Sequence, residues 1–153
     1  MTETSESREY PGRPFVGVGI VALGPEGVLM IQRGKPPRAG SWSLPGGAQH
    51  LGETVEDAAR REAMEETGLE VEVLGLVDVV DSIRHDDSGR VQYHYTLVDV
   101  LARAVGGRVQ AGGDAMDARW VPLAELPSLG LWSETIRVIE LAVEMTATLD
   151  GGA

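Results

Sequence analysis

The sequence predicts a single α+β domain built around a mixed β-sheet. Its 153 residues fit one domain. Several runs rich in β-branched residues alternate with turn-forming residues, whereas only two segments have the apolar period of an amphipathic helix. Many strands with two helices give an α+β layout, in which the helices cover the faces of the sheet.

The first part of the chain predicts a β-hairpin followed by a long loop. Residues 15–23 are apolar and β-branched, which is typical of a buried strand. A turn at 24–27 leads to a second strand at 28–33, so the two strands are expected to form a hairpin. Residues 34–47 carry several glycines and prolines and predict a long loop, and such loops in compact domains are often functional.

A central helix is expected over residues 54–67. Thr54, followed three residues later by Asp57, matches a capping box. Gly68 suits the left-handed conformation that closes a helix. Period-two alternation, turn residues and a second amphipathic stretch predict the later elements. These are strands at 69–83, 91–105 and 118–123, a turn at 84–90, and a helix from 133 to about 146.

The composition excludes several classes of protein. The chain lacks cysteine, which rules out disulfides, zinc–thiolate sites and thiol nucleophiles. Its net charge of −11 disfavours nucleic-acid binding, which depends on basic side chains. No apolar run is long enough for a membrane helix, and the polar N-terminus is unlike a secretory signal. We therefore expect a cytoplasmic protein with one domain at 13–148 and flexible tails at 1–12 and 149–153.

Three glutamates, Glu62, Glu65 and Glu66, stand near the end of the central helix. At about 100° per residue they share a sector with small and apolar residues of earlier turns, so we expect this side to pack inward. Like charges at these spacings repel, and the C-terminal end of a helix disfavours anions. A divalent cation such as Mg²⁺ would remove both objections, because it takes oxygen ligands. The alternative is a solvated acidic face, the usual role of a charge cluster.

The residues around this helix form a longer pattern with fixed spacings. Its members are Gly47, Glu53, Arg61, Glu62, Glu65, Glu66, Gly68 and Leu69. The pattern resembles the Nudix box, the signature of the Nudix hydrolases. Ala63, where a larger aliphatic residue is usual, is the one soft departure. Flanking segments, among them "RPFVGVGIV" and "ARWVPLAEL", resemble a branch described as ADP-ribose pyrophosphatase-like.

The resemblance implies an α/β/α sandwich with a mixed sheet and a loop–helix–loop catalytic motif. It also implies that Mg²⁺ or Mn²⁺ is bound by Glu62, Glu65 and Glu66. The carbonyl of Gly46, just before the box, is a further implied ligand. A bound cation would explain why the anions gather at a helix end.

Four residues are catalytic candidates: Glu62, Glu65, Glu53 and Arg61. Glu62 is the first choice for the base that takes a proton from the attacking water, and Glu65 is the second. The resemblance places Glu53 near the metal, held by Arg61. The alternative for this pair is a structural ion pair that ties the loop to the helix.

The candidates for substrate binding lie outside the helix. Arg33 and Lys35 are expected to meet phosphates, with solvated loop charge as the alternative, which is favoured for Arg38. Trp42 either stacks on a base or anchors the loop. Asp114 is either an extra carboxylate of the site or part of a surface turn. Three histidines without metal-ligand spacing are expected on the surface or in strands: His50, His85 and His94.

The resemblance implies hydrolysis of a nucleoside diphosphate linked to another group. ADP-ribose, cleaved to AMP and ribose 5-phosphate, is the leading substrate. One alternative is hydrolysis of nucleoside triphosphates to monophosphates. Another is a nucleotide sensor with a Nudix fold. The complete set of glutamates argues against this alternative. The expected partner is a small nucleotide, with neither nucleic acid nor membrane involved, and relatives often form homodimers.

Overall fold

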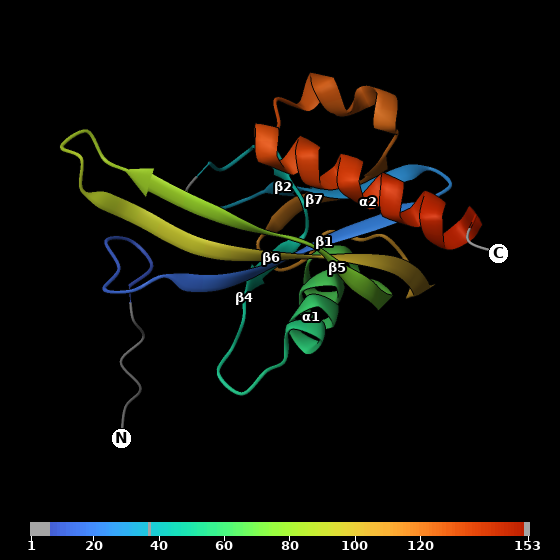
Figure 1. Ribbon diagram of the computed structural model, residues 1–153, viewed down its shortest axis with the longest axis horizontal. Helices are drawn as coiled ribbons and strands as arrows, with labels where there is room; N and C mark the ends of the chain where they lie inside the picture. The colour runs from blue at the N-terminus through green and yellow to red at the C-terminus, as the bar shows by residue number, and fades with distance from the viewer. Residues whose placement is uncertain (1–6, 37, 152–153) are drawn as a thin grey trace.

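The computed structural model describes residues 7–36 and 38–151, and it confirms the α+β fold. The elements in chain order are β1 (Phe15–Gly24), β2 (Gly27–Arg33), β3 (Trp42–Ser43), β4 (Gly46–Ala48), α1 (Val55–Thr67), β5 (Leu69–His85), β6 (Val91–Gly107), β7 (Ala115–Val121), the 3-10 helix η1 (Leu123–Leu129) and α2 (Ser133–Gly151). Helices α1 and α2 lie on opposite sides of the sheet (Figure 1).

The sheet is mixed because β1 pairs in parallel with β6, whereas the other pairings are antiparallel. The predicted β1–β2 hairpin is confirmed, but the two strands pair only beside the turn, at Leu23 with Val28 and Gly24 with Gly27. Away from the turn, β1 lies between β4 and β6, whereas β2 lies between β3 and β7. The strands that surround the site therefore diverge from this hairpin.

Two apolar cores hold the layers together. On the α1 side, Ile20 and Leu29 pack with the small side chains of Ala58, Ala59 and Ala63. Ala63, where the motif usually has a larger aliphatic residue, is fully buried, and its methyl group packs in this core. On the other side, α2 contributes a second apolar face. That core includes Val21, Met30, Leu101, Val138 and Ile139.

The predicted capping of α1 is confirmed at both ends. The Thr54 side chain accepts a hydrogen bond from the Asp57 backbone N–H, and Gly68 adopts a φ of 73°. The Gly68 backbone N–H donates to the carbonyl of Met64, which closes the last turn. These contacts fix where α1 begins and ends, and hence where its three glutamates lie.

The structure corrects several predicted boundaries. The segment at 34–47, predicted as loop throughout, contains β3 and the start of β4, because its backbone pairs with β2 and β1. The 3-10 helix η1 was not predicted. Helix α2 continues to Gly151, past the expected end of this helix at about 146. Its last turns include only one large apolar side chain, Leu149, which is 59% exposed and so continues no buried face.

Part of the expected N-terminal tail contacts the β5–β6 hairpin. The Tyr10 hydroxyl donates to Asp86, and the Tyr10 backbone N–H donates to the carbonyl of Gln92. The side chain of Gln92 in turn donates to Glu9. Residues 1–6 and 152–153 of the two expected tails lie outside the described residues. Within the described chain, neither helix combines the length and the apolar character needed to span a bilayer.

Candidate active site

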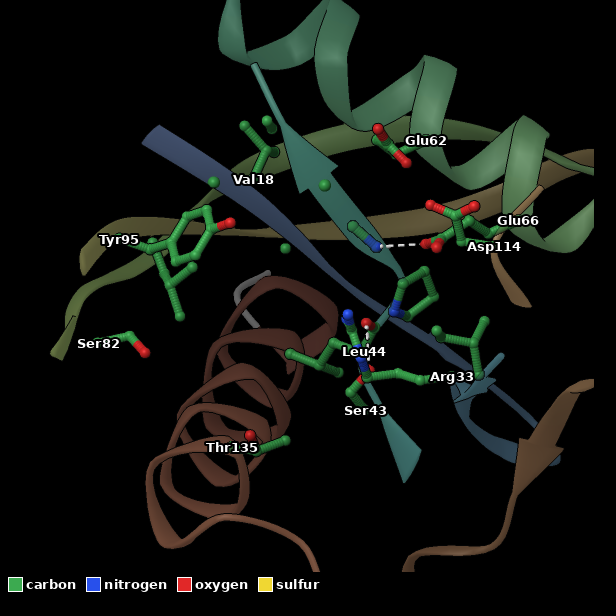
Figure 2. A pocket seen from close by; sticks show the side chains of 18 of the residues that line it. Val18, Arg33, Ser43, Leu44, Glu62, Glu66, Ser82, Tyr95, Asp114 and Thr135 are labelled. Atoms are coloured by element: carbon green, nitrogen blue, oxygen red, sulfur yellow. Dashed lines mark hydrogen bonds between the residues drawn. The ribbon is translucent and has the colours of Figure 1, made fainter. Parts of the chain in front are cut away.

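A cavity of about 590 Å³ lies between α1 and the start of α2 (Figure 2). The three glutamates of α1 line one end of it. Segment 41–48 forms the middle of the wall, and residues of β1, β5 and β6 form the floor. The first residues of α2 close the other end. A cavity of this size is typical of small-molecule sites.

The three glutamates are buried to different degrees. Glu62 and Glu66 are 9% and 6% exposed, so the prediction that their side of the helix packs inward is confirmed for them. The Glu65 side chain is 52% exposed, so the prediction was wrong for this residue. Glu65 lies at the edge of the inward sector, where the helix surface turns toward solvent.

Glu66 links α1 to the loop in front of it. Its Oε1 accepts a hydrogen bond from the backbone N–H of Gly46 over 2.7 Å. Burial raises the pKa of Glu66 to about 7. The Gly46 N–H and the charge of Arg33 act in the opposite direction, and the charge of Glu62 adds to the rise. In the absence of a cation, the folded protein therefore holds Glu66 partly protonated near neutral pH.

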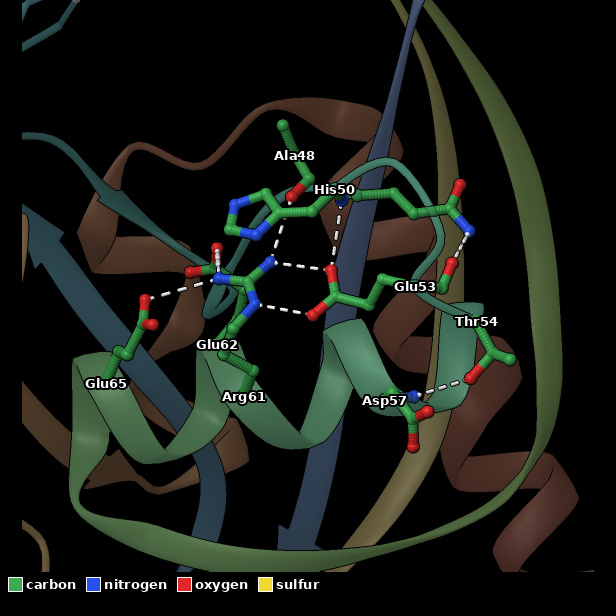
Figure 3. A network of polar contacts seen from close by, with 9 residues as sticks. Ala48, His50, Glu53, Thr54, Asp57, Arg61, Glu62 and Glu65 are labelled. Atoms are coloured by element: carbon green, nitrogen blue, oxygen red, sulfur yellow. Dashed lines mark hydrogen bonds and ion pairs between the residues drawn. The ribbon is translucent and has the colours of Figure 1, made fainter.

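Arg61 is the centre of a charged network (Figure 3). Its Nε and Nη2 donate to the two carboxylate oxygens of Glu53 over 2.7 and 2.9 Å. Its Nη1 donates to Glu62 over 2.7 Å and to Glu65 over 3.3 Å. Its Nη2 also reaches the carbonyl of Ala48. One guanidinium therefore holds the loop before α1 and two of the three glutamates.

Glu53 stands behind Arg61. Among the described residues, the cavity wall includes Arg61 but not Glu53. Hydrogen bonds from Arg61 and from the backbone N–H of His50 lower the pKa of Glu53 to about 2. The Gln49 side chain donates to the carbonyl of Glu53 and fixes the loop further. This geometry favours a positioning role for Glu53 over direct contact with a substrate.

The glutamates fit a divalent cation by chemistry and by space. Carboxylate and carbonyl oxygens are the ligands that Mg²⁺ and Mn²⁺ prefer. Gly47 leaves room for the Glu62 carboxylate, because a Cβ there would lie 2.6 Å from Glu62 Cδ. In residues 7–36 and 38–151, no three acidic or histidine side chains already converge as a ligand set. Arg61 holds one carboxylate oxygen of Glu62 and one of Glu65.

The predicted substrate residues all border the cavity. Arg33, Lys35 and Arg38 lie on its wall with Trp42 and Asp114. Lys35 and Asp114 form an exposed ion pair of 2.9 Å, so Asp114 sits in the rim of the site. Trp42 packs partly against the α2-side core, and its ring carries the guanidinium of Arg119 at 4.5 Å. It therefore anchors the loop and lines the cavity at once.

Sequence reasoning missed the floor and the α2 end of the cavity. Residues on these surfaces are Gly17, Gly19, Ser82, Tyr95, Asp99, Trp132, Glu134 and Thr135. One signal was available: Asp99 is a carboxylate inside the apolar run "TLVDVLA". The exposed His50 also lies on the wall, whereas His85 and His94 do not belong to the described lining.

The mixed sheet between two helices, with acidic side chains on a capped helix after a glycine loop, defines a Nudix hydrolase. The chain belongs to the Nudix family, since the model of the NUDIX domain matches residues 13–142. Members of this family typically depend on divalent metal ions. The match includes every residue of the predicted motif.

The relatives divide between two kinds of substrate. The chain is 38% identical to the ADP-ribose pyrophosphatase of Methanocaldococcus jannaschii, over 80% of this chain and 70% of that protein. It is 30% identical to the human 8-oxo-dGDP phosphatase NUDT18, over 85% of this chain but only 39% of that protein. The crystal structure of a MutT NUDIX hydrolase from Burkholderia pseudomallei is 33% identical, with a TM-score of 0.71 and coverage of 84% and 98% of the two chains.

Proposed function

We propose that this enzyme hydrolyses the pyrophosphate bond of a nucleoside diphosphate linked to another group, with ADP-ribose as the leading substrate. The main observation in support of the proposal is that one cavity joins three kinds of surface. Its acidic end is on α1, its cationic rim holds Arg33 and Lys35, and its deep floor lies below α2. Similarity to the pyrophosphatase of Methanocaldococcus jannaschii supports ADP-ribose.

The residues that would hold Mg²⁺ or Mn²⁺ are Glu62, Glu65 and Glu66, with the carbonyl of Gly46. The ion would neutralise phosphate charge and lower the pKa of a bound water molecule. Arg61 orients Glu62 through its contact with Oε1. This contact is made by a planar, permanently charged group whose other side is fixed by Glu53.

Glu62 is the first candidate for the general base. Water attacks one phosphorus, the bond from that phosphorus to the bridging oxygen breaks, and the leaving group departs as a phosphate monoester. The proton of the attacking water passes to the carboxylate. Among the described residues nothing donates to Glu62 Oε2, so this oxygen is available to accept the proton. Glu65, which is more exposed, is the second candidate.

A second candidate substrate is an oxidised purine nucleotide. Similarity to the human 8-oxo-dGDP phosphatase favours it. The same acidic end would serve both reactions, because both cleave a phosphoanhydride. The two candidates differ in the base and in the leaving group, and hence in contacts at the floor and the rim.

The test is a substrate panel with identification of products. Purified protein with Mg²⁺ is given ADP-ribose, 8-oxo-dGDP and 8-oxo-dGTP. The expected result is preferential release of AMP and ribose 5-phosphate from ADP-ribose. Faster turnover of an oxidised nucleotide, without turnover of ADP-ribose, would overturn the leading choice. Absence of turnover on the whole panel, while nucleotides still bind, would favour the sensor.

A further inference from the structure

Asp99 is a buried carboxylate without a hydrogen-bond partner among residues 7–36 and 38–151. It lies in the middle of β6, is 6% exposed and lines the cavity floor. Among the described residues, no side chain or backbone group donates a hydrogen bond to its carboxylate. Buried polar groups are normally hydrogen-bonded, and a buried charge without a partner is costly. Such a group in a binding cavity points to a donor supplied by the ligand.

The carboxylate oxygens of Asp99 open into the cavity. In the described chain, every side-chain nitrogen or oxygen that is fully shut off from solvent has a partner. Since Asp99 has none, its oxygens are accessible from the cavity. One of them leans over Gly19 of β1, where a Cβ would collide with Asp99 Oδ1. The absence of a side chain at Gly19 thus creates the space that Asp99 occupies.

The cation whose charge acts on Asp99, Arg137, is engaged with other carboxylates. Arg137 of α2 contacts Asp78 of β5 over 2.8 Å and Glu134 over 2.7 Å. Asp78 is the direct cross-strand neighbour of Asp99. Burial raises the pKa of Asp99 to about 6, with the charge of Asp78 adding to the rise and that of Arg137 opposing it. Arg137 therefore orders this end of the cavity without satisfying the Asp99 carboxylate.

The surroundings of Asp99 suit a flat ring. Gly17 and Gly19 of β1 lie on the floor, and their missing side chains leave room for those of Leu97 and Asp99 from β6. Leu44 and Leu97 are apolar neighbours in the cavity wall, and the half-exposed ring of Trp132 stands at the α2 end. Aromatic and apolar surfaces around one polar group are typical of sites that hold a nucleobase.

We propose that Asp99 determines base specificity by accepting hydrogen bonds from the amino-bearing edge of a purine nucleobase. This inference rests on the proposed function, because a nucleotide must occupy the cavity. Adenine and guanine each carry an exocyclic amino group. The ring nitrogen next to that group is a hydrogen-bond acceptor in adenine and a second N–H donor in guanine. A ribose hydroxyl is the competing donor, and the experiment separates it from a base.

The experiment measures binding by calorimetry and so needs no turnover. The probes are AMP, GMP and the 5′-monophosphate of unsubstituted purine riboside, which lacks both the amino group and a ring N–H. Wild-type protein is expected to bind AMP or GMP at least about tenfold more tightly than the unsubstituted analogue, as for a hydrogen bond to a charged group. Asp99→Leu should remove this difference and leave affinity for the analogue within about twofold.

The control is Asp81→Leu, which changes an exposed aspartate of β5 outside the cavity lining and should leave all affinities unchanged. Asp99→Asn distinguishes adenine from guanine, and it is the test to use if Asp99→Leu does not fold. An asparagine matches the donor and acceptor of adenine, so AMP binding should persist. It cannot accept two hydrogen bonds from guanine, so GMP binding should weaken about tenfold.

Two results would overturn the inference. One is equal affinity of the wild type for amino-bearing and unsubstituted nucleotides. The other is an equal loss for all three probes in the Asp99 variants, which would indicate contact with ribose. Failure of the proposed function is distinct, because it would be absence of pyrophosphate hydrolysis with base discrimination in binding intact.

Discussion

The backbone N–H of Gly46 lies 2.7 Å from Glu66 Oε1 and joins β4 directly to the last turns of α1. The contact ties a buried carboxylate to Gly46, the residue whose carbonyl is proposed as a further cation ligand. Glu66 is therefore positioned by the sheet, whereas Glu62 and Glu65 are held by Arg61. The positions of the glutamates at the acidic end of the cavity thus depend on both Gly46 and Arg61.

Replacing Glu65 should abolish most activity without affecting the fold. Its side chain is 52% exposed, so Glu65→Gln should change the free energy of unfolding by less than about 0.5 kcal/mol. Loss of one anionic cation ligand should lower kcat by about 100-fold or more. The measurement is steady-state hydrolysis with Mg²⁺, next to a thermal melt. Glu56→Gln, a change at an exposed position on the same helix, is the control. Near-normal activity of Glu65→Gln would refute the metal assignment.

A methyl group at Gly47 should displace the Glu62 carboxylate. In Gly47→Ala the new Cβ would stand 2.6 Å from Glu62 Cδ. The end of a glutamate side chain can move, so the fold should persist while kcat falls by about 100-fold through misplacement. Gly12→Ala is the matched control, because nothing lies within 4 Å of a Cβ there. Equal activities of the two variants would show that the position of Glu62 is unimportant.

The Glu53–Arg61 pair should make the protein sensitive to acid. Because Arg61 lowers the pKa of Glu53 from 4.5 to about 2, its stabilising effect is complete above pH 4.5 and is lost as the pH falls through 2. Glu53→Gln should therefore be less stable than the wild type at neutral pH, with a difference that shrinks below pH 4.5. Denaturant titrations at several pH values measure this. Glu26→Gln, in the exposed β1–β2 turn, should show no such trend. A constant difference for Glu53→Gln would contradict the assignment.

Asp99 should have the opposite pH dependence. Burial and, less strongly, the charge of Asp78 raise the pKa of Asp99 from 3.8 to about 6 on folding, against the opposing charge of Arg137. Its contribution to stability is therefore complete below pH 3.8 and is lost as the pH rises through 6. Asp99→Asn stays neutral throughout. It should gain up to about 3 kcal/mol relative to the wild type between pH 4 and pH 7. Denaturant titrations of the ligand-free proteins test this, with Asp81→Asn as control, and a flat difference would show that Asp99 titrates normally.

The predictable part of the fold is the part with strong local patterns. Runs of β-branched residues located β1, β2, β5 and β6, and Thr54 and Gly68 located the ends of α1. The strand β3 was missed because two residues are too few to show a period, and β4 because glycine and alanine have weak strand preference. Both pair with longer strands, β3 with β2 and β4 with β1. The helix η1 was missed for a related reason, since it contains Pro127 and is too short to show a period.

The sequence by itself determined the family and the acidic motif, because the spacing along one capped helix fixes which side chains share a face. Only the tertiary structure decided that Glu65 is exposed whereas Glu62 and Glu66 are buried. It also decided that Arg61 joins the two halves of the motif, and that Asp99 lies on the floor of the same cavity without a partner in the described part of the chain. These relationships arise from packing between segments far apart in the chain, and no local pattern of residues encodes them.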